Sequence, residues 1–143
     1  LNIKYFPDAN IPYDQSNDMV ILRLADIILM KAEALVRAGT GLPKALDLVN
    51  QVRQRAYHGD AGHNITMPSL TLDFILAERA RELSWENWRR QDLIRFEVAT
   101  GTPYFTGART PAKTADGDTH TFLFPIPAPE ILSNPNLHQN PGY

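Results

Sequence analysis

The sequence predicts a mainly α-helical protein: a tetratricopeptide-like helical hairpin, further helices, and a proline-rich irregular C-terminal tail that wraps around them. Two observations carry this prediction. Apolar residues recur at helical spacing through the first two thirds of the chain, and glycine or proline marks the ends of these stretches. The last third, residues 98–143, holds 7 of the 11 prolines, which favours extended chain and turns.

The change in composition near residue 98 also predicts how the chain is organised. We expect residues 1–18 to form an irregular arm, residues 19–97 a helical part, and residues 98–143 a loop and tail. A length of 143 residues suits one compact unit or part of a larger one. Because the chain begins with Leu1, we expect a segment of a longer protein whose N-terminal part is absent here.

The first helix is expected at about residues 23–38. It is apolar on several sides, so we expect it to be buried between neighbours. Glu33 and Arg37 are four residues apart in the favourable order for an ion pair, and Asp26 shares their face. Gly39 is expected to end the helix.

The second helix is expected to open at Pro43, where the missing N–H costs nothing. Its inward stripe comprises Ala45, Leu48, Val49, Val52 and Ala56. Because about four residues join the two helices, they should pack antiparallel as an αα-hairpin. The sequence holds one such unit, whereas a stable solenoid normally needs at least about three.

A third helix is expected from an N-cap at Thr71 to about Asn87. Its core face comprises Leu72, Ile75, Leu76, Ala80 and Leu83. A shorter helix should follow at about residues 90–98, with Leu93, Ile94 and Phe96 facing inward. We expect the remaining chain to be coil, with a short strand at residues 120–124.

Composition excludes several function classes. The net charge is -2 and no basic run occurs, so nucleic-acid binding lacks its electrostatic basis. The absence of cysteine excludes disulfides, zinc thiolate sites and thiol catalysis within this chain. The longest apolar run, residues 27–30, is far below the roughly 20 residues that span a bilayer. No cofactor motif is present.

Glu78, Glu82 and Glu86 are spaced by four residues on one predicted helix. Paired carboxylates can hydrolyse glycosides, but such a pair must flank the bond, and these lie on one side. Structural ion pairs are therefore the favoured interpretation. We assign the following residues to an ion-pair network: Asp26, Glu33, Glu78, Arg79, Glu82, Glu86, Arg89, Asp92 and Arg95.

Two other groups of side chains contain residue types that can carry chemistry. His58, Asp60 and His63 could together hold a divalent metal, but their spacing matches no known closed site, so no metal is predicted. Ser69 and Ser84 lack the surroundings of a nucleophile. No catalytic residue is predicted.

The aromatic residues divide into two groups. Trp85 and Trp88 lie in a helical stretch, where indoles usually fill core, so we expect them to pack. Tyr104 and Phe105 lie in a loop rich in glycine and threonine, where burial is less compulsory. They are the candidate glycan-binding residues of this segment, or else a partner contact.

Four motifs, in the right order, resemble the SusD/RagB family. They are R-x-A-D with A-E-A at residues 23–34, N-x-V-R at residues 50–53, E-R-x-x-E-L…E-x-x-R-x-x-D-L-x-R at residues 78–95, and the P-I-P…E-I…N-P-x-L-x-Q-N-P-G-Y terminus at residues 125–143. One departure is Asn87, where the family usually has glycine; asparagine tolerates the same left-handed backbone.

The resemblance implies a parent protein that captures glycans without cleaving them. Such a protein would carry a signal peptide and an N-terminal lipidated Cys outside this segment, and would sit on the outer membrane surface. It would deliver oligo- or polysaccharide to a SusC-like TonB-dependent transporter. Its sugar site would lie largely upstream, so this segment would be mainly scaffold, with Leu137 and Tyr143 anchoring the tail. The alternative, suggested by the αα-hairpin, is a helical-repeat module that binds a protein or peptide.

Overall fold

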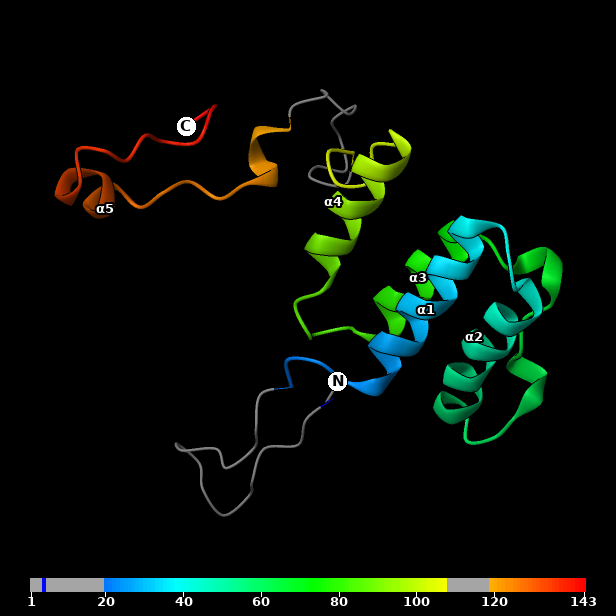
Figure 1. The fold of residues 1–143 in the computed structure, drawn as a ribbon. Coiled ribbons are helices and arrows are strands. Elements are labelled where there is room, and N and C mark those ends of the chain that lie inside the picture. Colours follow the sequence, from blue (N-terminus) through cyan, green and yellow to red (C-terminus); the bar gives the residue numbers. More distant parts are fainter. Residues whose placement is uncertain (1–3, 5–19, 108–118) are drawn as a thin grey trace, which may run out of the picture. The chain divides into compact units, whose positions relative to one another are not determined.

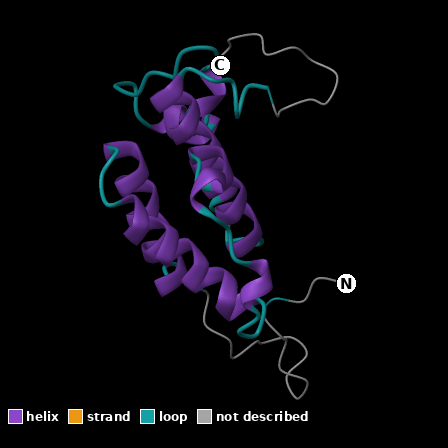
Figure 2. Ribbon diagram, turned by 90° about the vertical axis from the view of Figure 1, so that its right-hand side faces the viewer, coloured by secondary structure: helices purple, strands orange, loops and turns teal. Residues whose placement is uncertain are grey.

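The computed structural model of the chain describes Lys4, residues 20–107 and residues 119–143. These residues form five α-helices and short 3-10 turns, and no β-strand occurs among them (Figures 1 and 2). The mainly helical class is confirmed, whereas its tetratricopeptide-like character stays a prediction. The expected arm at residues 1–18 lies outside the described residues, apart from Lys4.

The chain divides into two compact units, Leu1–Arg89 and Arg90–Tyr143. The first unit contains α1 (Leu24–Ala38), α2 (Leu42–Ala56) and α3 (Leu72–Glu82). As expected, α1 contacts both α2 and α3, and it lies between them in Figure 1.

The α1–α2 hairpin turns within three residues. Gly39 adopts a left-handed backbone (φ 64°) and its N–H donates to the Val36 carbonyl at 3.1 Å, which ends α1. Pro43 stands in the first turn of α2, as expected. The short connection makes the two helices antiparallel neighbours.

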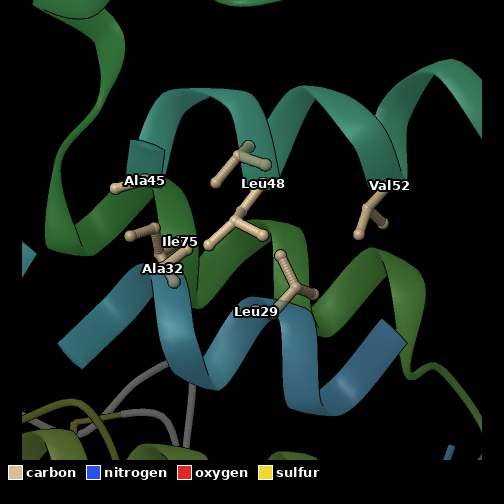
Figure 3. Close-up of a cluster of buried hydrophobic side chains, with 7 residues drawn as sticks. Leu29, Ala32, Ala45, Leu48, Val52 and Ile75 are labelled. Atoms are coloured by element: carbon tan, nitrogen blue, oxygen red, sulfur yellow. The ribbon is translucent and has the colours of Figure 1, made fainter. Parts of the chain in front are cut away.

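The core of the first unit lies between the three helices (Figure 3). Ala32 of α1 and Ala45 of α2 are both fully buried, and their small side chains let the helices approach closely. Ile75 of α3 completes the cluster from the other side. The buried members are Leu29, Ala32, Ala45, Leu48, Val49, Val52 and Ile75. Ala56 was wrongly placed in this stripe: it is the last residue of α2 and is exposed.

α3 begins as predicted, with the Thr71 hydroxyl accepting a hydrogen bond from the Phe74 N–H at 3.1 Å. It ends at Glu82 and not at Asn87, which corrects the expected boundary. The cause is local backbone geometry, because Trp85 and Asn87 both have positive φ (66° and 63°) and cannot continue a right-handed helix.

The second unit opens with α4 (Arg89–Thr100), which buries Asp92 and Phe96 and leaves Leu93 and Ile94 half-buried. The strand expected at residues 120–124 is wrong: a 3-10 helix forms at His120–Phe122. Prolines at 125 and 127 follow it and lack the N–H that a strand ladder needs.

The tail is less irregular than expected, because residues Ala128–Ser133 form the short helix α5. Pro129 stands in the first turn, where a helix needs no N–H donor. The proline-rich composition of the tail favoured coil, so a helix with Pro129 in its first turn was not expected there. Whether the tail wraps the other helices stays a prediction.

The last residues fold back on the tail in an arrangement that we call the C-terminal clasp, formed by residues 123–126 and 139–143. The Gln139 side chain accepts from the Ile126 N–H at 2.8 Å and donates to the Ile126 carbonyl at 2.9 Å. Asn140 donates to the Phe124 carbonyl at 2.7 Å, and the Tyr143 hydroxyl donates to the Leu123 carbonyl at 3.0 Å. Side chains thus form the hydrogen bonds to the backbone of this segment, in which Pro125 and Pro127 have no N–H to donate.

Candidate functional site

Three glutamates recur at every fourth residue in the second half of α3 and the turn after it. The side chains of Glu78, Glu82 and Glu86 are each 8% exposed or less. Buried carboxylates are costly unless they are paired, and the structure surrounds these with cations. We call the following eight residues the glutamate network: Glu78, Glu82, Glu86, Lys4, Arg23, Arg53, Arg55 and Arg81.

Arg23, the residue directly before α1, binds the end of α3. Its Nε donates to both carboxylate oxygens of Glu86 at 3.0 and 2.8 Å. Its Nη1 donates to the Glu82 carboxylate, and its Nη2 to the Glu82 carbonyl, both at 2.5 Å. One guanidinium therefore satisfies two carboxylates and one of the carbonyls left over at the helix end.

Lys4 contacts the same place. Its ammonium pairs with Glu86 and donates to the carbonyls of Glu82 and Ser84 at 2.5 and 3.1 Å. Lys4 and Arg23 are not among the residues that were expected to form ion pairs, although Arg23 begins the R-x-A-D motif. They lie some 60 to 80 residues before Glu82 and Glu86 in the sequence, and only folding brings them into contact.

These contacts shift two acid–base equilibria. Burial raises the pKa of the Glu86 carboxyl, but hydrogen bonds and charge from Arg23 and Lys4 outweigh burial, and the pKa falls below its ordinary value. Burial lowers the pKa of Arg23, but the hydrogen bonds that it donates to Glu86 and Glu82, together with their charges, outweigh burial and raise the pKa overall. Both groups are held in their charged forms.

Glu78 is bound from two directions. Arg53 of α2 donates to its carboxylate at 2.8 Å, and Arg81 donates from one turn along α3 at 3.0 and 2.5 Å. Arg53 also donates to the His63 carbonyl at 2.7 Å. In the same N-x-V-R motif, the Asn50 side chain pairs with both the N–H and the carbonyl of Ile65 at 2.8 and 3.0 Å. The motif thereby holds the α2–α3 loop and joins α2 to α3.

The deepest ion pair joins Asp26 of α1 to Arg79 of α3. Their charged atoms lie 2.7 Å apart, and their side chains are only 1% and 2% exposed. Glu33 pairs with Arg37 at 2.7 Å within α1, as its spacing predicts. The Asp26–Arg79 pair thus joins two helices, whereas the Glu33–Arg37 pair lies within one.

The remaining residues assigned to the network form separate contacts. Arg89 donates to the Leu76 carbonyl at 3.2 Å within the first unit. Asp92 and Arg95 pair with each other at 2.9 Å within α4. Within the first unit Asp26 therefore pairs with Arg79, and within α4 Asp92 pairs with Arg95; one network of all nine residues stays a prediction.

The loop between α2 and α3 uses its polar residues locally. Asp60 accepts from the Gly62 N–H at 2.8 Å, and the His63 ring stacks on Tyr57 with 3.9 Å between centroids. Among the described residues, no group of three or more His, Cys, Asp or Glu side chains is placed to hold a metal.

The indoles do not both pack as expected. Trp88 is half-buried, but Trp85 is 78% exposed, so its predicted place in the core is wrong. Its left-handed backbone explains the difference, because α3 has already ended and no helical face carries the side chain inward. Trp85 lines a surface hollow of about 600 Å³, and it borders a second of about 350 Å³.

Tyr104 and Phe105 are half-buried in the second unit. Tyr104 lies edge-on to Phe96 with 5.9 Å between ring centroids, and Phe105 lies edge-on to Phe122 at 5.8 Å. The Arg90 guanidinium stands 5.4 Å from the Phe105 ring. A role in glycan binding stays a prediction for both.

No helix in the described part of the chain is both long and apolar enough to cross a membrane.

Comparison with known proteins finds the SusD family model over residues 4–143. The starch-binding protein SusD of Bacteroides thetaiotaomicron is 32% identical over 141 residues, covering 96% of this chain and 22% of that protein. SusD-like proteins P2 and P38 of Formosa agariphila are each 30% identical, covering 91% and 100% of this chain and 27% and 28% of their own lengths. The chain thus spans about a quarter of these relatives. No solved structure matches it. The chain belongs to the SusD family.

Proposed function

We propose that the full-length protein captures a glycan at the outer membrane without cleaving it. Two findings support this: the family match extends over residues 4–143, and one relative is named a starch-binding protein. The glutamates that could serve a hydrolase support it further, since each is buried against arginine. Carboxylates held in such ion pairs on one side of a helix end do not flank a substrate, as a glycosidase pair must.

Within that protein, we propose that this segment is mainly scaffold. The observation that carries this is the glutamate network, in which Arg23 ties the start of α1 to the end of α3 while Arg53 ties α2 to α3. A network of this kind fixes the mutual placement of helices. In this role the segment supports a sugar site built from other parts of the protein.

The partners follow from the same proposal. We propose that the protein lies on the outer membrane surface, held by a lipidated cysteine outside this segment. We also propose that it passes the glycan to a SusC-like TonB-dependent transporter. Affinity purification of the tagged full-length protein from its own outer membrane tests this, since a transporter should copurify in near-equal amount.

Calorimetry with the full-length protein and a panel of oligosaccharides tests glycan capture. We expect binding of at least one oligosaccharide, with no shorter product after prolonged incubation by chromatography. Turnover of the bound sugar would refute the non-catalytic proposal, and absence of binding across the panel would refute glycan capture.

A protein- or peptide-binding role of the helical hairpin remains the second candidate. Leu24, Ile27 and Met30 favour it, because they recur every three residues along α1 and are 71%, 48% and 41% exposed. Exposed apolar side chains on one helix face suit a protein contact. Crosslinking from Ile27 replaced by a photoreactive residue would show whether a second polypeptide lies there.

A further inference from the structure

We propose that the hollow beside Trp85 binds a sugar ring carrying a negative group, a carboxylate or a sulfate. This rests on the proposed glycan capture and adds a ligand class and a place to it. The hollow belongs wholly to the first unit and is lined by Trp85, Ser84, Lys4, Arg23, Arg55 and Arg81, among others. Its volume of about 600 Å³ falls within the range of roughly 300–1,000 Å³ usual for ligand pockets.

The exposed indole supplies the sugar-facing surface. Trp85 is 78% exposed although its large apolar ring would gain from burial. Its backbone is also left-handed (φ 66°), a conformation that non-glycine residues rarely adopt. Strain of this kind is held by surrounding contacts and occurs often at ligand clamps. A flat, exposed aromatic ring can stack on the C–H face of a sugar.

The charge balance supplies the preference for a negative ligand. Among the described residues, the glutamate network sets five cations against three carboxylates. Two positive charges are therefore left uncompensated. The surplus reaches the surface at Arg55 and Arg81, whose side chains are 61% and 51% exposed.

The donors of these two arginines are only partly used. Arg55 pairs with Glu82 through Nη2, and Arg81 donates to Glu78 through Nε and Nη2. A guanidinium carries five N–H donors, and one carboxylate engages two of them at most in the forked geometry. The remaining donors can bind a carboxylate or sulfate group while the ring lies on Trp85.

Binding to the full-length protein tests the proposal with three defined probes: oligogalacturonate, a sulfated galactan oligosaccharide and maltoheptaose. We expect at least one acidic probe to bind, with an affinity that weakens as salt rises because the contact charges are exposed. Trp85→Ala should weaken it by about tenfold or more, and Arg81→Gln by severalfold. Whichever acidic probe binds distinguishes carboxylate from sulfate.

Arg95→Gln is the matched control. Arg95 is also an exposed arginine paired one turn along its helix with a buried carboxylate, at 44% side-chain exposure, but it does not line the hollow. We expect it to leave affinity unchanged. Hydroxyl-radical footprinting of the full-length protein gives a second readout: Trp85 should be oxidised in the free protein and protected by the acidic probe.

Two outcomes would overturn the inference while leaving glycan capture intact: a sugar that binds with unchanged affinity after Trp85→Ala and Arg81→Gln, or a Trp85 that resists oxidation in the free protein because another part of it covers the indole. Failure of every oligosaccharide in a broad panel to bind would instead count against the proposed function itself.

Discussion

Replacing Arg79 with methionine should destabilise the three-helix unit strongly. Arg79 faces Asp26 at 2.7 Å, and Asp26 is fully buried. Methionine fills much of the same volume but leaves the Asp26 carboxylate without its cation. Removing one partner of a buried ion pair costs about 3–5 kcal/mol, whereas an exposed pair is worth roughly 0–1 kcal/mol. The expected loss is therefore several times that of a surface arginine.

Hydrogen exchange of the full-length protein, read by mass spectrometry, measures this locally. Peptides from α1 and α3 should exchange at least about a hundredfold faster in Arg79→Met, since 1.4 kcal/mol is a factor of ten. Arg55→Met, which removes an exposed arginine while Glu82 keeps its pair with Arg23, should change exchange by less than about tenfold.

The double variant Asp26→Leu/Arg79→Met separates the charge from the packing. Two apolar side chains leave no buried charge unpaired, so exchange protection should return to within about tenfold of the unmodified protein. If the single variant exchanges no faster than Arg55→Met, the assigned cost of the buried pair is wrong. If the double variant is as damaged as the single one, packing and not charge carries the effect.

Three further predictions concern single positions. Because folding lowers the pKa of Glu86, its contribution to the free energy of unfolding is present above the unfolded pKa and is lost as pH falls through the folded value. Acid unfolding should show this loss of stability, and Arg23→Gln should flatten that part of the stability–pH profile. Asn87→Ala should destabilise by about 1–2 kcal/mol in urea while Asn87→Gly should not, because φ is 63° there. Gly142→Ala should disrupt the C-terminal clasp, since an added Cβ would lie 2.5 Å from the Cβ of His120 and φ is 95°, and faster exchange at residues 123–126 measures this; unchanged exchange would contradict it.

Much of the helical fold could be predicted because it depends on local signals. The capping threonine at 71, the glycine at 39 and the proline at 43 act on the chain within one turn, and each does what its position predicts. The end of α3 could not be predicted this way. The spacing of its apolar residues does not indicate that Trp85 adopts a left-handed backbone.

The ion pairs were harder to predict for a different reason. Spacing identified Glu33 with Arg37 because both lie on one helix. Arg23 and Glu86 are 63 residues apart, so their contact depends on how three helices pack. α5 was missed because a proline in the first turn of a helix looks, in sequence, like a proline that breaks one.

The pair of Asp26 and Arg79 also bears on the order in which the chain folds. α1 and α2 leave the ribosome first and can meet as a local hairpin, but Asp26 has no cation until α3 follows some 50 residues later. A hairpin that closed early would keep that carboxylate in water and its core open on the side that Ile75 fills. We therefore expect the final packing of the hairpin to wait for α3, which supplies both Arg79 and Ile75.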